Sequence, residues 1–167
     1  MTILGVDPGF ERLGVAILKK DKGKEELVYS TCITSDKSDS PERRLYSLGR
    51  ELEKIIKKFK PGILAAEKLF FFKNQKTIMG VAEARGMILY LAGVRHIPVY
   101  EFTPLEVKIA LTGYGRAEKK QVQTMVKALL KLKAVPSSDD EVDAIAVAIT
   151  ASGSLKIRRY PQESSIN

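Results

Sequence analysis

The sequence predicts an α/β fold with a mixed five-stranded sheet and helices on both of its faces. Three short apolar strands come first, separated only by turn residues, and the later strands alternate with helices before a helical final third. Strands joined by tight turns pair antiparallel, whereas strands separated by a helix pair parallel. The sheet is therefore expected to be antiparallel at its start and parallel where helices cross over.

The first three strands are expected to form a meander. Residues 2–7 are an apolar run closed by a Pro-Gly turn, residues 13–18 resume the pattern, and residues 27–34 form the third strand. Between the second and third strands, residues 21–24 (Asp-Lys-Gly-Lys) are turn-forming types. Each of these strands is thus predicted to pair with the one before it.

Pro41 opens the clearest predicted helix, which a second Pro-Gly pair at residues 61–62 ends. Lys and Glu occupy one face of this segment, and apolar residues recur at helical spacing on the other. The apolar positions are Leu45, Leu48, Leu52, Ile55, Ile56 and Phe59. Beyond it we predict a fourth strand at residues 63–67, a helix at 76–93 with small residues along one side, and a fifth strand at 99–102.

From Pro104 onward the pattern is helical, with breaks at two glycines. A long helix is predicted for residues 118–132 and a last one for 139–152, where Ser138 and Glu141 have the spacing of a capping box. One domain is expected to span residues 1–152, because a chain of 167 residues fits a single core. Residues 153–167 are basic without a core pattern and are expected to be a mobile tail.

Composition restricts the chemistry that the chain can perform. Cys32 and His96 are the only residues of their types, so neither a disulfide framework nor a Cys/His zinc site can form within one chain. The net charge of +8 favours a polyanionic partner, although a solvated cationic surface is an equally ordinary explanation. Residues 1–6 do not resemble a signal peptide and no apolar run could span a bilayer, so a cytoplasmic protein is expected.

Two acidic residues stand at the ends of predicted buried strands. Asp7 closes the first strand and Glu67 closes the fourth. If these strands are parallel neighbours, their carboxyl ends emerge on one edge of the sheet, where open α/β sheets place their sites. The alternatives are that Asp7 only caps the turn that follows and that Glu67 only faces solvent.

Two further acids share one face of the last predicted helix. Asp140 and Asp143 are three residues apart, and Asp143 interrupts a run that is otherwise apolar on nearly every side. Asp139 and Glu141 need no functional explanation, because acids are favoured in a first helical turn. Four converging carboxylates repel one another unless cations lie between them, and oxygen ligands without histidine or thiolate select Mg²⁺ or Mn²⁺. Such a site suits two-metal hydrolysis of a phosphodiester.

Several short motifs in order resemble the RuvC family of crossover junction endodeoxyribonucleases, from residue 3 to about residue 150. They are Gly5-Val6-Asp7-Pro8-Gly9 with Gly14, Ala66-Glu67 followed by Phe70, Lys73 and Asn74, Glu83-Ala84-Arg85-Gly86, Val107-Lys108, Gly113-Tyr114-Gly115-Arg116-Ala117-Glu118-Lys119, and Asp140-Glu141-Val142-Asp143-Ala144-Ile145-Ala146. The resemblance implies an RNase H-like fold, a homodimer, two Mg²⁺ ions per subunit for which Mn²⁺ substitutes, and paired symmetric nicks in a four-way DNA junction. It also implies a role in DNA recombination and repair and a possible branch-migration helicase partner.

The resemblance also implies roles for individual residues. The four catalytic and metal-binding acids are Asp7, Glu67, Asp140 and Asp143. Asp139 leaves the register ambiguous, and Asp140 is preferred because its spacing to Asp143 matches the family. The DNA-binding residues are Phe70, which would stack on a base near the junction centre, and Lys73, Asn74, Lys108 and Lys119. For Phe71 and Phe72, core or dimer packing is the preferred interpretation.

The helix near residues 78–93 is the candidate dimer contact, through Met79, Ala82, Gly86 and Tyr90, unless it packs only on its own sheet. Phe10 and Glu11 depart from the smaller or basic residues expected after the Pro-Gly turn. An actin-like ATPase is excluded by length, because it needs two domains. The remaining alternatives are another RNase H-like nuclease acting on structured RNA and a non-catalytic junction-binding module.

Overall fold

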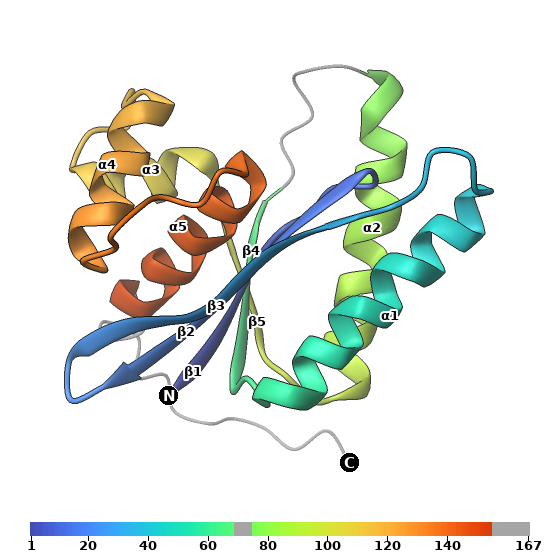
Figure 1. The fold of residues 1–167 in the computed structure, drawn as a ribbon, viewed down its shortest axis with the longest axis horizontal. Coiled ribbons are helices and arrows are strands. Elements are labelled where there is room, and N and C mark those ends of the chain that lie inside the picture. Colours follow the sequence, from blue (N-terminus) through green and yellow to red (C-terminus); the bar gives the residue numbers. More distant parts are fainter. Residues whose placement is uncertain (69–74, 155–167) are drawn as a thin grey trace, which may run out of the picture.

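The structure, a computed structural model, describes residues 1–68 and 75–154. Within these residues, five strands and five helices follow one another in the order that the sequence predicts (Figure 1). The strands are β1 (Thr2–Asp7), β2 (Arg12–Asp21), β3 (Lys24–Thr34), β4 (Ile63–Glu67) and β5 (Val99–Phe102). The helices are α1 (Pro41–Phe59), α2 (Gln75–Val94), α3 (Pro104–Thr112), α4 (Lys119–Leu129) and α5 (Asp139–Ser154).

All five strands form one mixed sheet in the order β3-β2-β1-β4-β5. The first three strands pair antiparallel, and β1, β4 and β5 pair parallel. The predicted meander and the predicted crossover strands are therefore both confirmed. Because β1 is central, the end of β1 lies beside the end of β4.

Helices cover both faces of the sheet and enclose two apolar cores. In Figure 1, α1 and α2 lie on one side of the sheet and α3, α4 and α5 lie on the other. The first core joins the sheet to α1 and α2 through residues such as Leu48, Leu52 and Ile88, and the second joins it to α5. Nearly every residue of α5 from Val142 to Ser152 is buried, as expected for a helix packed on a sheet and on other helices.

Local sequence signals account for the ends of several elements. Lys22 and Gly23 both have positive φ in the tight turn between β2 and β3, the backbone that a two-residue hairpin requires. Pro41 occupies the first turn of α1, where its missing N–H leaves no bond unmade, and Lys60 ends that helix in the left-handed conformation. Thr103 and Glu106 form a capping box at the start of α3.

Three predicted details differ from the structure. The helix predicted for residues 118–132 ends at Leu129, and the last helix, predicted for residues 139–152, extends to Ser154. The predicted capping box on α5 is replaced by tertiary contacts, because the Ser30 hydroxyl donates to Glu141 at 2.9 Å and Ser138 bonds with Arg12 and Asp140. The tail from residue 155 onward lies outside the described residues.

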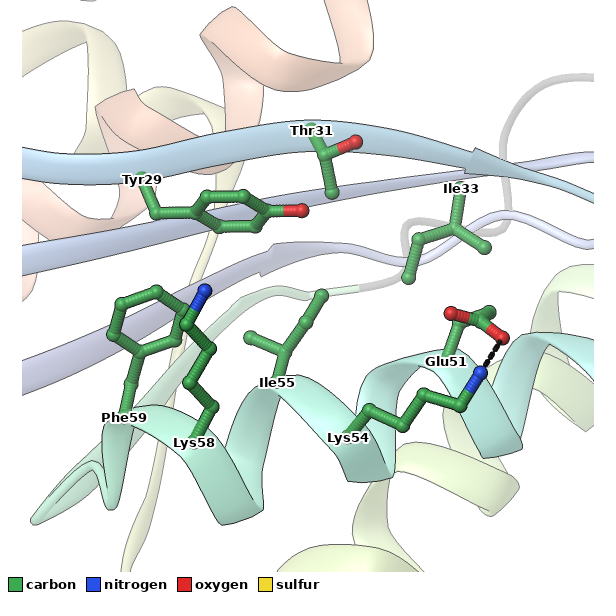
Figure 2. A pocket seen from close by; sticks show the side chains of 8 residues that line it. All are labelled: Tyr29, Thr31, Ile33, Glu51, Lys54, Ile55, Lys58 and Phe59. Atoms are coloured by element: carbon green, nitrogen blue, oxygen red, sulfur yellow. Dashed lines mark hydrogen bonds and ion pairs between the residues drawn. The ribbon is translucent and has the colours of Figure 1, made fainter.

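A cavity of about 350 Å³ opens between β3 and α1, and neither Asp7 nor Glu67 is among the described residues that line it (Figure 2). The rings of Tyr29 and Phe59, with centroids 5.3 Å apart, close one end of it. Glu51 is its one acidic lining residue and is paired with Lys54 at 2.5 Å. This cavity therefore does not contain the predicted acidic site. Among the described helices, none has the length and apolar content needed to cross a membrane.

Candidate active site

Asp7 and Glu67 end neighbouring parallel strands. The pairing of β1 with β4 brings Val6 opposite Ala66, so the next residue on each strand is one of the two acids. Both side chains emerge on the same edge of the sheet, as the sequence predicted. The two charges are close enough that Glu67 raises the pKa of Asp7.

Helix α5 reaches these strand ends by resting on two glycines. A Cβ added to Gly5 would lie 2.2 Å from the carbonyl oxygen of Ala144, and one added to Gly14 would lie 1.9 Å from that of Asp140. Only a residue without a side chain permits such a close approach of strand and helix backbones. The glycines on β1 and β2 thus allow the first turns of α5 to lie beside Asp7.

One cavity of about 250 Å³ gathers residues from four separated motifs. Glu67 at the end of β4, Lys108 on α3, Lys119 on α4 and Asp143 on α5 all line it. Its remaining walls are apolar: Pro104, Val107, Val122 and Ala146. Two of the predicted acids and both predicted lysines among the described residues therefore face one space.

The carboxylates at this edge disfavour one another's charge. Burial, followed by the charges of Glu67, Asp143 and Asp140, raises the pKa of Asp7 from 3.8 to about 8. Burial and then the charge of Asp143 raise the pKa of Glu67 from 4.5 to about 7. Perturbed carboxylates of this kind are typical of sites that bind cations or perform acid–base chemistry.

Lys119 partly neutralises the acids on α5. Its ammonium nitrogen lies 3.3 Å from Asp143 Oδ2 and 3.3 Å from Asp139 Oδ2. Burial raises the pKa of Asp143 even though Lys119 opposes the shift. The sequence suggested that an unpaired charge at position 143 would be costly, and the structure provides the partner.

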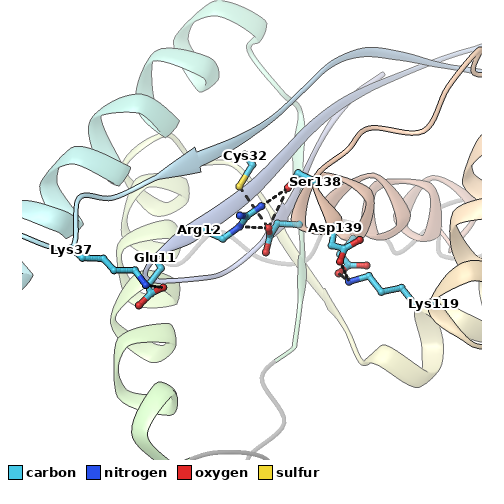
Figure 3. A network of polar contacts seen from close by, with 9 residues as sticks. Glu11, Arg12, Cys32, Lys37, Lys119, Ser138 and Asp139 are labelled. Carbon is cyan, nitrogen blue, oxygen red and sulfur yellow. Dashed lines mark hydrogen bonds and ion pairs between the residues drawn. The ribbon is translucent and has the colours of Figure 1, made fainter.

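Asp140 is held by a residue that the sequence did not single out. Arg12 Nε donates to Asp140 Oδ2 at 2.6 Å, Ser138 Oγ donates to the same oxygen at 3.2 Å, and Cys32 Sγ lies 3.7 Å from it. Figure 3 shows Arg12, Cys32 and Ser138 gathered at this point. Burial acts to raise the pKa of Asp140, but the hydrogen bond and the charge of Arg12 outweigh it and hold the pKa below 3.8. The only sequence signal was that Arg12 follows the turn after Asp7.

The structure also distinguishes between the two neighbouring acids Asp139 and Asp140 at the start of α5. Asp140 contributes to the raised pKa of Asp7, and the charges that shift it do not include that of Asp139. The Asp139 side chain is 62% exposed and accepts a hydrogen bond from Gln123 at 3.1 Å. Of these two acids, Asp140 is thus the one whose charge acts on Asp7, and its assignment as a catalytic residue remains a prediction.

The donor set fits a hard divalent cation, although the side chains are not arranged around one. Within residues 1–68 and 75–154, no three His, Cys, Asp or Glu side chains already form a metal-ligand set. Asp140 is turned to Arg12, and Asp143 to Lys119. Carboxylate oxygens are nevertheless the ligands that Mg²⁺ and Mn²⁺ prefer, and the acids at this edge come from three elements, β1, β4 and α5.

Five residues discussed from the sequence cannot be placed. Phe70, Phe71, Phe72, Lys73 and Asn74 lie outside the described residues. Their predicted roles therefore remain predictions. Lys108 and Lys119 are described, and both line the cavity of Glu67 and Asp143.

Comparison with known proteins identifies the family. The model of the crossover junction endodeoxyribonuclease RuvC family matches residues 3–151, which include all the elements that build this site. This chain belongs to the RuvC family. A RuvC from Fusobacterium nucleatum is 45% identical over 155 residues, covering 93% of this chain and 82% of the relative. The RuvC of Syntrophomonas wolfei is 41% identical over 166 residues, covering 99% and 96%.

A solved RuvC structure agrees with the fold. Thermus thermophilus RuvC in complex with a Holliday junction substrate superposes with a TM-score of 0.89 at 29% identity, covering 94% of this chain and 96% of that one. The fold is RNase H-like, as the resemblance implied. The match covers both layers of helices as well as the sheet.

Proposed function

We propose that this chain cuts four-way DNA junctions as a divalent-metal-dependent endonuclease, through Asp7, Glu67, Asp140 and Asp143. The observation that carries the proposal is the cavity in which Glu67 and Asp143 face Lys108 and Lys119, with Asp7 on the neighbouring strand. Acids suit the binding of cations, and lysines suit the binding of phosphate. Family membership supports the same activity, and the Thermus thermophilus relative was solved with a Holliday junction substrate.

The four acids would hold two Mg²⁺ ions per subunit, for which Mn²⁺ would substitute. Bound divalent ions activate water and stabilise the departing oxygen of a phosphodiester. The protein would supply the negative charge that such ions need: Asp7 and Glu67 stand at the sheet edge, where burial first and neighbouring carboxylates second raise their pKa values. Lys108 and Lys119 would orient the scissile strand, each as a point charge at the wall of the cavity.

A homodimer would make two equivalent cuts on opposite sides of the junction. Helix α2 supports this part of the proposal. Ala84, Ile88 and Ala92 form its buried face, whereas the four residues that the sequence predicted for the dimer contact, Met79, Ala82, Gly86 and Tyr90, lie on an exposed face. Met79 and Tyr90 in that stripe are 71% and 69% exposed, which is unusual for large apolar side chains in one row. A second copy of α2 would cover them.

The proposal also extends to partners and location. A branch-migration helicase complex would direct the enzyme, and the protein would act in the cytoplasm in DNA recombination and repair. Both statements follow from the family resemblance and remain predictions. Neither depends on the geometry of the acids.

The test is a nicking assay on a synthetic four-way DNA junction with Mg²⁺ or with EDTA. The wild type is expected to make paired symmetric nicks only with Mg²⁺. Asp7→Asn and Asp143→Asn are expected to lose cutting while still binding the junction. Retained cutting by either variant would contradict the site assignment.

Asp139→Asn is the matched control, because this acid neighbours Asp140 but is not among the charges that shift the pKa of Asp7 and is mostly exposed. It is expected to keep most of the activity, whereas Asp140→Asn is expected to lose it. A structured RNA of similar charge is the second substrate. Preferential cleavage of that RNA would favour the other RNase H-like nuclease, and junction binding without Mg²⁺-dependent cutting would favour a non-catalytic module.

A further inference from the structure

Arg12 stands apart from the four acids and two lysines assigned so far. It follows the turn after Asp7 and reaches across the sheet to α5, where it is an ion-pair partner of Asp140 at 2.6 Å and donates to Ser138 Oγ at 3.0 Å. Its side chain is 53% exposed, so it is not fixed in place by burial. It lies at the junction between the acidic edge and open surface.

The contacts of Asp140 show what Arg12 occupies. Arg12, Ser138 and Cys32 all converge on one carboxylate oxygen, Oδ2. A divalent cation that used this oxygen would meet the guanidinium at the same atom. The two cations would therefore compete for Asp140, by charge repulsion and by space.

An open cavity gives Arg12 a second place to lie. It has a volume of about 560 Å³, and its lining includes Gly9, Phe10, Arg12 and Arg44. The Arg44 guanidinium lies 4.2 Å from the centre of the Phe10 ring, and both residues line this cavity. Two acids also line the cavity, and one of them, Glu11, is already paired with Lys37 at 2.9 Å. Figure 3 shows the Glu11–Lys37 pair at the other end of the network from Lys119.

We propose that Arg12 is an exchangeable counter-ion of Asp140. In the metal-free protein it holds this acid; when a divalent cation binds, Arg12 leaves Asp140 and contacts a phosphate of the junction at the cavity that it shares with Arg44. Arg12 is thus a positioning residue that links metal loading to DNA contact. This inference rests on the proposed metal site and names one basic residue that acts with it.

The first experiment measures Mn²⁺ binding to DNA-free protein from the loss of the free-ion electron paramagnetic resonance signal. Arg12→Gln is expected to bind Mn²⁺ about two- to fivefold more tightly, since a partly exposed ion pair is worth up to about 1 kcal/mol. Arg12→Lys keeps the charge and is expected to stay within about twofold of the wild type. Lys37→Gln, which removes a nearby exposed cation that pairs with Glu11, is the matched control and should leave the affinity unchanged.

Every outcome of the Mn²⁺ measurement either supports or contradicts the proposed exchange of Arg12 for a cation at Asp140. Unchanged affinity in Arg12→Gln would overturn the exchange, and weaker affinity would show that Arg12 orients Asp140 for the metal instead. Absence of Mn²⁺ binding in every protein, wild type included, would contradict the metal site itself, which separates failure of the proposed function from failure of this inference. Thermal unfolding of each variant without metal verifies that it is folded.

The second experiment measures the salt dependence of junction affinity, with Ca²⁺ in place of Mg²⁺ or with EDTA. With Ca²⁺, Arg12→Gln is expected to reduce the slope of log affinity against log salt by about 1, the effect of losing one phosphate contact. With EDTA, the wild type and the variant should have the same slope, because Arg12 then stays on Asp140. An equal reduction in both conditions, or none in either, would overturn the exchange.

Discussion

Gly14 on β2 lies directly under Asp140 on α5, so close that a Cβ on the glycine would sit 1.9 Å from the Asp140 carbonyl oxygen. This contact brings the first turn of α5 to the strand end that carries Asp7. The position of one acid thus depends on the absence of a side chain on another element. The position of Asp140 in the acidic site therefore depends on how closely the backbones of β2 and α5 pack.

Gly14→Ala is therefore expected to displace the start of α5 and to destabilise the protein by about 1 to 3 kcal/mol, the usual range for forced overpacking. Urea unfolding followed by circular dichroism measures the change. Gly153→Ala, in α5 itself, is the control, because a Cβ there has no neighbour within 4 Å. It should leave stability unchanged or slightly raised, and an equal loss in both variants would contradict the role given to Gly14.

Stability without metal is expected to fall as the pH rises from about 5 to about 8. The pKa of Asp7 is raised to about 8 and that of Glu67 to about 7 in the folded chain, so the folded state holds more protons than the unfolded state across this interval. The loss should level off above the raised pKa of Asp7. Urea midpoints in EDTA at several pH values measure it, and a midpoint that rises across the interval would contradict the electrostatic picture.

Asp7→Asn is expected to stabilise the metal-free protein and to remove its response to metal. The amide keeps the shape of the carboxylate but ends its repulsion with Glu67 and Asp143. In EDTA at pH 8, the variant should melt about 2 °C or more above the wild type, the shift that about 1 kcal/mol gives in a chain of this size. Added Mg²⁺ should raise the melting temperature of the wild type and leave the variant nearly unchanged. A lower melting temperature for Asp7→Asn in EDTA would mean that Asp7 has a stabilising partner.

Tyr90→Glu is expected to dissociate the proposed dimer. Tyr90 is 69% exposed on α2, and a charge there would have to be buried between two copies of the helix. Sedimentation velocity at micromolar concentration should show a dimer for the wild type and a monomer for the variant. Leu129→Glu, at an exposed position of α4 on the opposite face of the sheet, should remain dimeric. A monomeric wild type would refute the dimer without affecting the acidic site.

Much of the site follows from local patterns in the chain. Residues 2–7 and 63–67 are short apolar runs that end in an acid, and a crossover helix between them makes parallel pairing the expected outcome. Their acids must then meet at one sheet edge. The spacing of Asp140 and Asp143 on a helix likewise places them on one face.

What surrounds the acids could not be predicted in this way. Arg12 and Asp140 are 128 positions apart, and their contact exists only because α5 crosses β2 at Gly14. For the same reason Glu141 bonds to Ser30 on β3 instead of completing a capping box with Ser138.

The sequence by itself determined which strands and helices form and which carboxylates share an edge, because periodicity and turn chemistry act between near neighbours. Only the tertiary structure decided which basic side chains form ion pairs with Asp140 and Asp143. A charged side chain pairs with whatever partner packing brings within about 4 Å, and packing joins segments that are far apart in the chain. The ion pairs Arg12–Asp140 and Lys119–Asp143 are therefore properties of how α5 packs on the sheet and how α4 packs on α5.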